Sequence, residues 1–140
     1  MVIAVDFDGT IVKHEYPKIG KPLMFAFETL KALQNQGHRL ILWTYRAGKE
    51  LEDAVEFCKQ NDVQFYAVNK NYPEEEFDET ISRKIYADIY IDDRNIGGFP
   101  GWSVIWNLIN NDIPFKSDEF FDIPEEKSDS FKDKLIKLFK

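Results

Sequence analysis

Residues 1–12 of the chain read MVIAVDFDGTIV, and this stretch decides the fold class. Residues 2–5 form a continuous apolar run, which is typical of a strand covered on both faces, as in a parallel sheet. The run ends in two acids, Asp6 and Asp8, which are separated by one residue and followed by Gly9. The sequence therefore predicts a buried first strand that brings two carboxylates to the end of a sheet.

Apolar strands and amphipathic helices alternate along the rest of the chain. We predict a helix that opens at Pro22 and stops near Gly37, because proline suits the first helical position and glycine the stop. The other predicted elements are strands over 40–43, 63–68 and 89–91, a helix with its buried stripe over 51–58, a helical turn over 82–86 and a helix over 102–109. This alternation predicts an α/β fold with a doubly wound parallel sheet. We interpret residues 1–140 as a single domain in which 110–140 contain an irregular tail and a terminal helix.

Composition and charge exclude some classes of function. The net charge is -7 and the pI is near 4.9, which argues against broad binding to nucleic acid, since that needs a positive field. The single cysteine allows no disulfide within the chain. No apolar run approaches the roughly 18 residues of a membrane span, and the apolar start lacks the basic leader of a signal peptide. We therefore expect a soluble, cytoplasmic protein without a membrane role.

The acidic residues lie where this fold class places its binding sites. Ligands of open α/β sheets bind at the carboxyl ends of the strands, and Asp6, Asp8, Thr44, Asp92 and Asp93 each follow a predicted strand. Four carboxylates in one cleft repel one another, and a divalent cation is the simplest compensation. Oxygen ligands and only two histidines in the chain indicate Mg²⁺ rather than zinc.

A phosphate is the natural companion of this cation, because protein-bound Mg²⁺ typically shares its ligand shell with phosphate oxygens. Gly9 allows close approach of the backbone, and Thr44, Arg46 and Lys84 supply a hydroxyl and positive charge. Each motif alone has a structural explanation: a turn, a strand residue or a solvated lysine. Their order and their common location at strand ends favour a binding site for Mg²⁺ and phosphate.

Four motifs together resemble those of the haloacid-dehalogenase-like (HAD) hydrolases. They are DFDGT at 6–10, WTYR at 43–46, Lys84, and the acid pair at 92–93. The resemblance implies that Asp6 is a nucleophile that forms an aspartyl-phosphate, and that Asp8 is the general acid and base. The true dehalogenases lack the second acid, so Asp8 favours hydrolysis of phosphate esters.

The resemblance also implies the remaining roles. Asp93 would bind Mg²⁺ directly, and Asp92 directly or through water. Separately from the resemblance, Arg94 and Asn95 directly follow this pair, and we expect them to orient it by hydrogen bonds. The full implied metal set is Asp6, Asp8 (through its backbone carbonyl), Asp92 and Asp93. The residues implied to surround the phosphoryl group are Gly9, Thr44, Tyr45, Arg46 and Lys84, with Lys70 as an alternative to Lys84.

The chain leaves little room for the cap domain that many HAD hydrolases insert. Residues 11–21, here called the flap, and residues 69–80 are long enough only for short loops. We therefore expect a member without a cap, and a neighbouring subunit could cover its open site, which leaves a homo-oligomer open. The acidic charge makes a phosphorylated small molecule a more natural substrate than the end of a nucleic acid.

Two other classes of function compete with a phosphatase. A phosphoaccepting signalling module also combines acids, a hydroxyl residue, a lysine and Mg²⁺, but its acid pair follows the first strand, whereas here the pair at 92–93 comes last. The other is an inactive HAD-like protein that binds Mg²⁺ and phosphate, against which the intact set of motifs argues.

Overall fold

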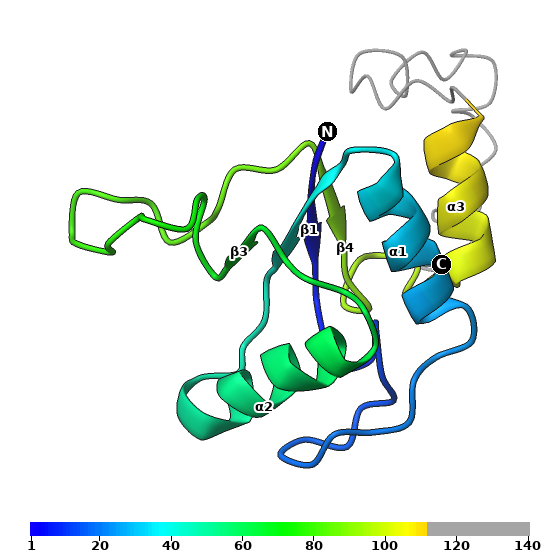
Figure 1. Cartoon of the computed structure of the whole chain (residues 1–140), viewed down its shortest axis with the longest axis horizontal. Coiled ribbons are helices and arrows are strands. Elements are labelled where there is room, and N and C mark those ends of the chain that lie inside the picture. Colours follow the sequence, from blue (N-terminus) through cyan, green and yellow to red (C-terminus); the bar gives the residue numbers. More distant parts are fainter. Residues whose placement is uncertain (112–140) are drawn as a thin grey trace, which may run out of the picture. The chain divides into compact units, whose positions relative to one another are not determined.

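The computed structural model of the chain describes residues 1–111. Residues 1–108 form one compact unit, and a second unit begins at Ile109. The expected terminal helix and most of the expected tail lie outside the described residues, so the prediction of one domain stays a prediction. Within the described part, the elements follow the order β1, α1, β2, α2, β3, β4, α3 (Figure 1).

The sheet has four parallel strands in the order β3-β2-β1-β4. This finding confirms the predicted parallel α/β class. The first strand is central, and its register pairs Val5 with Leu42 on one side and with Ile91 on the other, so three strands end side by side. The strands are β1 (Val2–Val5), β2 (Arg39–Leu42), β3 (Ala67–Val68) and β4 (Ile89–Ile91).

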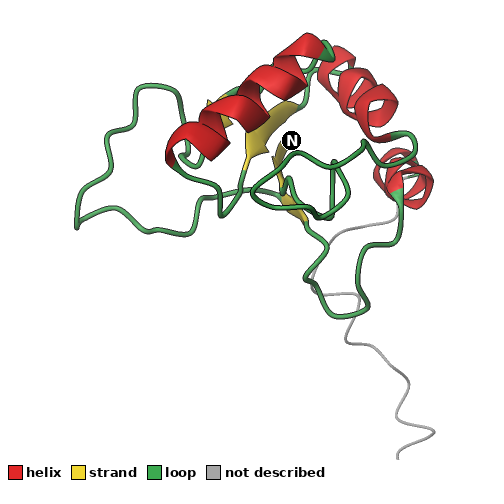
Figure 2. Cartoon of the chain, turned by 90° about the horizontal axis from the view of Figure 1, so that it is seen from below, coloured by secondary structure: helices red, strands yellow, loops and turns green. Residues whose placement is uncertain are grey.

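Helices α1 (Ala26–Asn35) and α2 (Gly48–Gln60) lie on the same face of the sheet (Figure 2). The opposite face packs Ala4, Ile41 and Ala67 against Ile85, which comes from the connection between β3 and β4. This connection, residues 69–88, contains no helix. The doubly wound arrangement is therefore incomplete at this connection. Helix α3 (Trp102–Asn110) follows β4, and its Trp102 indole N–H donates to the Thr10 carbonyl over 2.8 Å.

The first helix begins later than predicted. Residues 22–25 do not extend it, because Pro22 forms an antiparallel bridge with Val12 and the Leu23 N–H donates to the Ile11 carbonyl over 2.9 Å. Phe25, with a φ of 64°, turns the chain into the helix. The start signal at Pro22 was wrong because a pairing with residues far along the chain took precedence over local propensity.

The connection between β3 and β4 also differs from the prediction. The expected loop over 69–80 is confirmed, but the expected strand over 63–68 shortens to two residues, and the expected helical turn over 82–86 is wrong. The Asn71 side-chain oxygen accepts the Tyr86 N–H over 2.7 Å, so this backbone group is satisfied without a helix. Irregular backbone here lets Ile85 pack against the sheet.

The flap leaves the sheet after β1 and returns before α1, as the lower blue loop of Figure 1. Its base is closed by the Lys13 N–H, which donates to the Lys21 carbonyl over 2.8 Å. A Cβ on Gly20 would lie 2.0 Å from the Lys13 carbonyl oxygen, so the two arms can approach only because residue 20 is glycine. Among residues 1–111, no helix has the length and apolar character needed to cross a membrane.

Candidate active site

A cleft of about 760 Å³ opens where strands β1, β2 and β4 end. This is the edge at which parallel α/β sheets bind ligands. The lining brings together the three strand ends and the flap, and consists of Asp6, Asp8, His14, Tyr16, Trp43, Thr44, Tyr45, Arg46, Asp92, Asp93 and Arg94. Most of the predicted site residues therefore meet in one place, and the exceptions are Gly9, Lys84, Lys70 and Asn95, although Asn95 donates to the Asp92 carbonyl over 3.1 Å.

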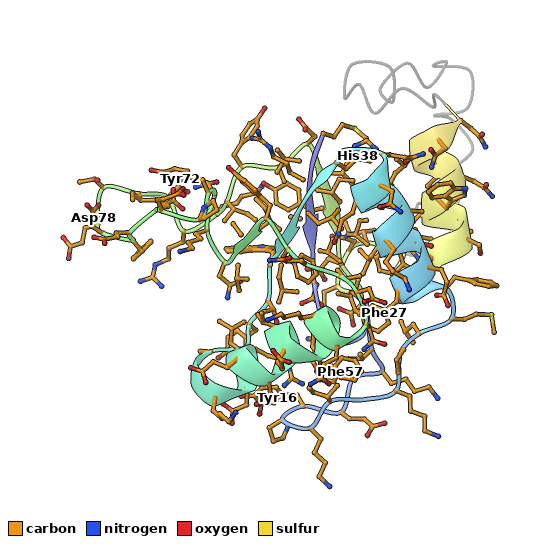
Figure 3. All side chains as sticks on the ribbon, viewed as in Figure 1. Tyr16, Phe27, His38, Phe57, Tyr72 and Asp78 are labelled. Atoms are coloured by element: carbon orange, nitrogen blue, oxygen red, sulfur yellow. The ribbon has the colours of Figure 1, made fainter. Side chains whose placement is uncertain are left out.

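Phe7 anchors the two acids that surround it in the sequence. Its side chain is fully buried and contacts Phe57 of α2 edge-on, with ring centroids 6.4 Å apart. Phe57 in turn contacts Phe27 of α1 edge-on, with ring centroids 5.8 Å apart, and the two labelled residues lie close together in Figure 3. The aromatic residue between the acids thus ties the start of the site to the core, while Asp6 and Asp8 line the cleft.

Asp6, Asp92 and Asp93 form a cluster that we call the acid triad. One carboxylate oxygen from each lies within 4.8 Å of the others. The pairing of strands explains this geometry, because the Asp6 N–H donates to the Ile91 carbonyl over 2.9 Å and so continues the β1–β4 ladder. The Asp92 carboxylate is oriented by the Arg94 N–H, which donates to it over 2.7 Å.

The acid triad fits a hard divalent cation. Among the described residues, the Oδ1 atom of Asp93 is buried without a hydrogen-bond partner, which is costly unless a ligand satisfies it. Burial, together with the charges of Asp92 and Asp93, raises the pKa of Asp6 from 3.8 to about 7, although hydrogen bonds from the Phe7 backbone and Thr10 oppose this shift. A cation would relieve both features, since it binds carboxylate oxygens and favours their charged form.

Gly9 serves the acid triad by being small. Its φ is +87°, and a Cβ at this position would lie 2.2 Å from the Asp93 Oδ2 atom. The Asp93 carboxylate therefore occupies the space that any side chain at residue 9 would need. Gly9 does not itself line the cleft. Its expected contact with phosphate stays a prediction, whereas its close approach to Asp93 is a feature of the structure.

Asp8 stands apart from the acid triad because Arg46 binds it. The Arg46 Nε donates to one Asp8 oxygen and its Nη2 to the other, each over 2.7 Å. The four carboxylates therefore differ in what offsets their charge: three form the acid triad, and the carboxylate of Asp8 is paired with Arg46. The backbone carbonyl of Asp8, rather than its side chain, remains the group implied as a metal ligand.

Arg46 corrects a second expectation. Its side chain is only 1% exposed, and its remaining N–H groups donate to the carbonyls of Pro17 (3.0 Å), Lys18 (2.8 Å) and Glu50 (3.5 Å). An arginine has five N–H donors, and all five have partners here. Arg46 has no donor left for a phosphate, so the expected role in phosphate binding is replaced by a structural one.

The flap is held over the site by the same guanidinium. Arg46 lies 5.2 Å from the Tyr16 ring centroid and 5.0 Å from that of Phe7. Figure 3 shows Tyr16 next to α2, far from Tyr72 and Asp78 on the projecting loop. Cation–π contacts of this kind and the bonds to the flap carbonyls fix the flap against the end of β2. One buried side chain therefore joins the flap, Asp8 and the start of α2.

Thr44 is held by two hydrogen bonds, one through its backbone N–H and one through its hydroxyl oxygen. Its N–H donates to the side-chain oxygen of Asn69 over 2.8 Å, and its hydroxyl oxygen accepts the Arg46 N–H over 3.2 Å. The hydroxyl proton can still be donated to a ligand in the cleft. Sequence reasoning missed Asn69, although an asparagine just after a strand is a signal, because asparagine tolerates the left-handed backbone that it adopts here, with φ 51°.

The lysine implied by the HAD resemblance does not reach the cleft. The Lys84 ammonium lies 5.1 Å from the Tyr90 ring centroid, and Lys70 donates to the Pro73 carbonyl instead. Neither side chain lines the cleft. Within residues 1–111, the arginines lining the cleft are Arg46 and Arg94, and Arg94 is the exposed one.

Comparison with known proteins identifies one clear relative. A solved structure, described as a conserved protein coded by a locus from Bacteroides thetaiotaomicron, is 55% identical to this chain, with a TM-score of 0.75. The alignment covers 79% of this chain and 90% of that one. The chain belongs to the family of this conserved Bacteroides protein. No family model and no curated protein matches the chain.

The description of the Bacteroides protein names no activity, substrate or cofactor. Membership of its family therefore supports the fold and leaves the chemistry to be argued from the cleft.

Proposed function

We propose that the protein is a Mg²⁺-dependent phosphate-ester hydrolase of the HAD type, acting on a phosphorylated small molecule. One observation carries the proposal: the acid triad holds a buried, unpartnered Asp93 oxygen beside Asp6, whose pKa burial raises to about 7. Such a cluster needs a cation to keep Asp6 ionised, and an ionised Asp6 is a nucleophile. The resemblance of the motifs to those of HAD hydrolases supports the same chemistry.

In the first step, an Asp6 carboxylate oxygen forms a bond to phosphorus while the bond from phosphorus to the ester oxygen breaks. Asp8 in its acid form gives a proton to the departing oxygen, which leaves as an alcohol. In the second step, Asp8 takes a proton from water, the water oxygen bonds to phosphorus, and the bond to Asp6 breaks. Phosphate is released, and both acids return to their starting states.

The surrounding residues support these steps by position. Asp6, Asp92 and Asp93 would hold Mg²⁺, together with the Asp8 carbonyl. When bound, the cation supplies charge neutralisation for the phosphoryl oxygens and the carboxylates. The Thr44 hydroxyl can donate to a phosphoryl oxygen. Each Asp8 oxygen accepts one bond from Arg46 and keeps a lone pair for the attacking water.

The positive charge expected from a lysine is the weakest part of the resemblance. Lys84 would have to leave the Tyr90 ring to reach the phosphoryl group. Arg94 lines the cleft already, and we include it as the alternative cation.

The test is release of phosphate from a panel of sugar phosphates, nucleotides and phosphorylated acids, with Mg²⁺ and with a chelator. We expect turnover with Mg²⁺ that falls to background with the chelator and in Asp6→Asn. Asp62→Asn is a matched control, because Asp62 is exposed, lies outside the cleft and has a left-handed φ of 61° that asparagine tolerates.

Two results would count against the proposal. Folded protein that binds Mg²⁺ but releases phosphate from no ester would favour the inactive binding protein. A stable phosphoryl group on Asp6 without turnover would favour the signalling module.

A further inference from the structure

The walls of the cleft beyond the acid triad carry aromatic rings from two separate segments. Tyr16 comes from the flap, and Trp43 and Tyr45 come from the end of β2. Tyr16 is 49% exposed and Tyr45 is 96% exposed. A tyrosine that is almost fully exposed beside a deep cleft gains nothing from the chain's own packing, whereas it offers a large flat surface to a ligand.

Both exposed rings project from backbone that is held in place. The flap carbonyls of Pro17 and Lys18 accept bonds from the buried Arg46, which also contacts the Tyr16 ring at 5.2 Å. On the other side, Thr44 and Arg46, the neighbours of Tyr45, each donate a backbone N–H to a side-chain oxygen, of Asn69 and Thr44 respectively. Rings on a fixed backbone lose little entropy when a ligand binds, so this arrangement is preorganised for stacking.

The size and charge of the cleft limit what the substrate carries besides its phosphate. A volume of about 760 Å³ falls in the range of sites that hold a whole organic ligand, not a phosphate group alone. All N–H donors of Arg46 have protein partners, which leaves Arg94 as the arginine of the lining with exposed charge. Besides Arg94, the described lining offers His14 as a side chain that could bind an anion, so a second phosphate or several carboxylates on the substrate would have few partners.

We propose that the substrate is a phosphate monoester whose organic part is a planar, uncharged aromatic ring that stacks on Tyr45 and Tyr16. This inference rests on the proposed hydrolase function and specifies its substrate class. A nucleoside monophosphate and an arylmethyl phosphate share this chemistry. The ring contributes to binding, while the phosphoryl chemistry at the acid triad is the same for every ester.

The experiment uses two pairs of esters that differ only in the ring. Adenosine 5′-monophosphate is compared with ribose 5-phosphate, and benzyl phosphate with cyclohexylmethyl phosphate. Within each pair the leaving group is a primary alcohol, so differences in kcat/KM report on binding of the ring. We expect the aromatic member to be preferred at least tenfold, mainly through KM, because base–aromatic stacking is commonly worth about that factor. A larger preference in the first pair indicates a nucleoside monophosphate as the substrate, and a larger preference in the second pair indicates an arylmethyl phosphate.

Substitutions then locate the contact. Tyr45→Ala is expected to reduce the preference about tenfold, because it weakens binding of the aromatic member more than that of the non-aromatic one, whereas Tyr45→Phe keeps the preference. Tyr86→Ala is the matched control, since Tyr86 is also exposed and lies outside the cleft. Equal kcat/KM within both pairs, or a preference that Tyr45→Ala leaves intact, would overturn the inference.

Binding to Asp6→Asn separates this inference from the hydrolase function. The variant lacks the nucleophile, so calorimetry with the same pairs in the presence of Mg²⁺ reports on ring recognition without turnover. Tighter binding of the aromatic member supports the inference even if no ester is hydrolysed. Equal binding of both members refutes it, and hydrolysis of ribose 5-phosphate by the wild type would leave the hydrolase function standing.

Discussion

Replacing Arg46 should destabilise the protein more than any other single change at the cleft. Arg46→Met keeps much of the side-chain volume but removes all five hydrogen bonds and leaves the Asp8 carboxylate without its cation. The side chains of Arg46 and Asp8 are only 1% and 11% exposed. Removing one partner of a buried ion pair costs about 3–5 kcal/mol, because the remaining charge stays buried without compensation.

The loss from breaking the ion pair should lie near the lower end of that range, because Asp8 keeps some contact with the solvent of the cleft. The flap carbonyls of Pro17 and Lys18 also lose their bonds to Arg46, and because they can bind water instead, this adds only about 1 kcal/mol. We expect a loss of roughly 4 kcal/mol in the free energy of unfolding. For a chain of this size that corresponds to a fall in Tm of roughly 10 °C.

Urea unfolding of the wild type, Arg46→Met, Asp8→Asn and the double variant measures the loss of unfolding free energy in each variant and the coupling energy between the two residues. The losses of the two single variants should not add in the double variant, because it no longer buries an isolated charge. A coupling energy of about 1–3 kcal/mol is expected. Trypsin should also cleave after Lys18 faster in Arg46→Met than in the wild type, because the flap has lost its anchor.

A matched control is the ion pair of Lys49 with Asp53 on α2, whose side chains are 75% and 49% exposed. Lys49→Met should leave the unfolding midpoint nearly unchanged, as exposed pairs contribute little. If Arg46→Met were as stable as Lys49→Met and its flap as resistant to trypsin, the reasoning that Arg46 holds the flap to Asp8 would be refuted.

Three further predictions concern the acid triad and its surroundings. Because the pKa of Asp6 is raised in the folded state, the contribution of Asp6 to the free energy of unfolding is present at low pH and is lost as pH rises from about 4 to about 7. Asp6→Asn or saturating Mg²⁺ should flatten this pH dependence of stability in urea titrations. Gly9→Ala should lower Mg²⁺ affinity at least about tenfold in calorimetry, since its Cβ would displace a triad carboxylate, whereas Gly97→Ala, with a similar φ of 92° and open space around it, should not. Asn69→Gly keeps the left-handed backbone but removes the acceptor for the Thr44 N–H, so KM for phosphate esters should rise several-fold. An unchanged KM would contradict the proposed part of Thr44 in phosphate binding.

The sheet could be predicted from the sequence because its strands are marked by local signals. Continuous apolar runs before Asp6 and Asp92 are typical of buried parallel strands, and both became strands within a residue of their predicted limits. The late start of α1 and the irregular backbone over 82–86 could not be predicted in this way. They depend on partners distant in the sequence, a bridge from Val12 and a side-chain acceptor on Asn71.

For the candidate site, too, local signals could be predicted and contacts between distant residues could not. The acids were predicted because residues that follow parallel strands must meet at one edge of the sheet. The partner of each acid could not be predicted, because it depends on side-chain direction and on how the flap folds back. Asp8 and Arg46 are 38 positions apart, and the sequence offered Arg46 as an exposed phosphate ligand just as readily as a buried one.

In the proposed hydrolase, the burial of Arg46 would let the flap take the part that a cap domain plays in other HAD hydrolases. A cap domain selects substrates by adding a surface over the site, and here a loop of eleven residues, 11–21, must do so. A loop this short has no core, and the guanidinium of Arg46 substitutes for one by binding two flap carbonyls and contacting Tyr16. Because the same guanidinium holds both oxygens of Asp8, the position of the aromatic wall and the position of the proposed acid and base are set by one side chain. A shift of the flap would therefore be expected to move Asp8, so that recognition of the organic part and proton transfer depend on the same contacts.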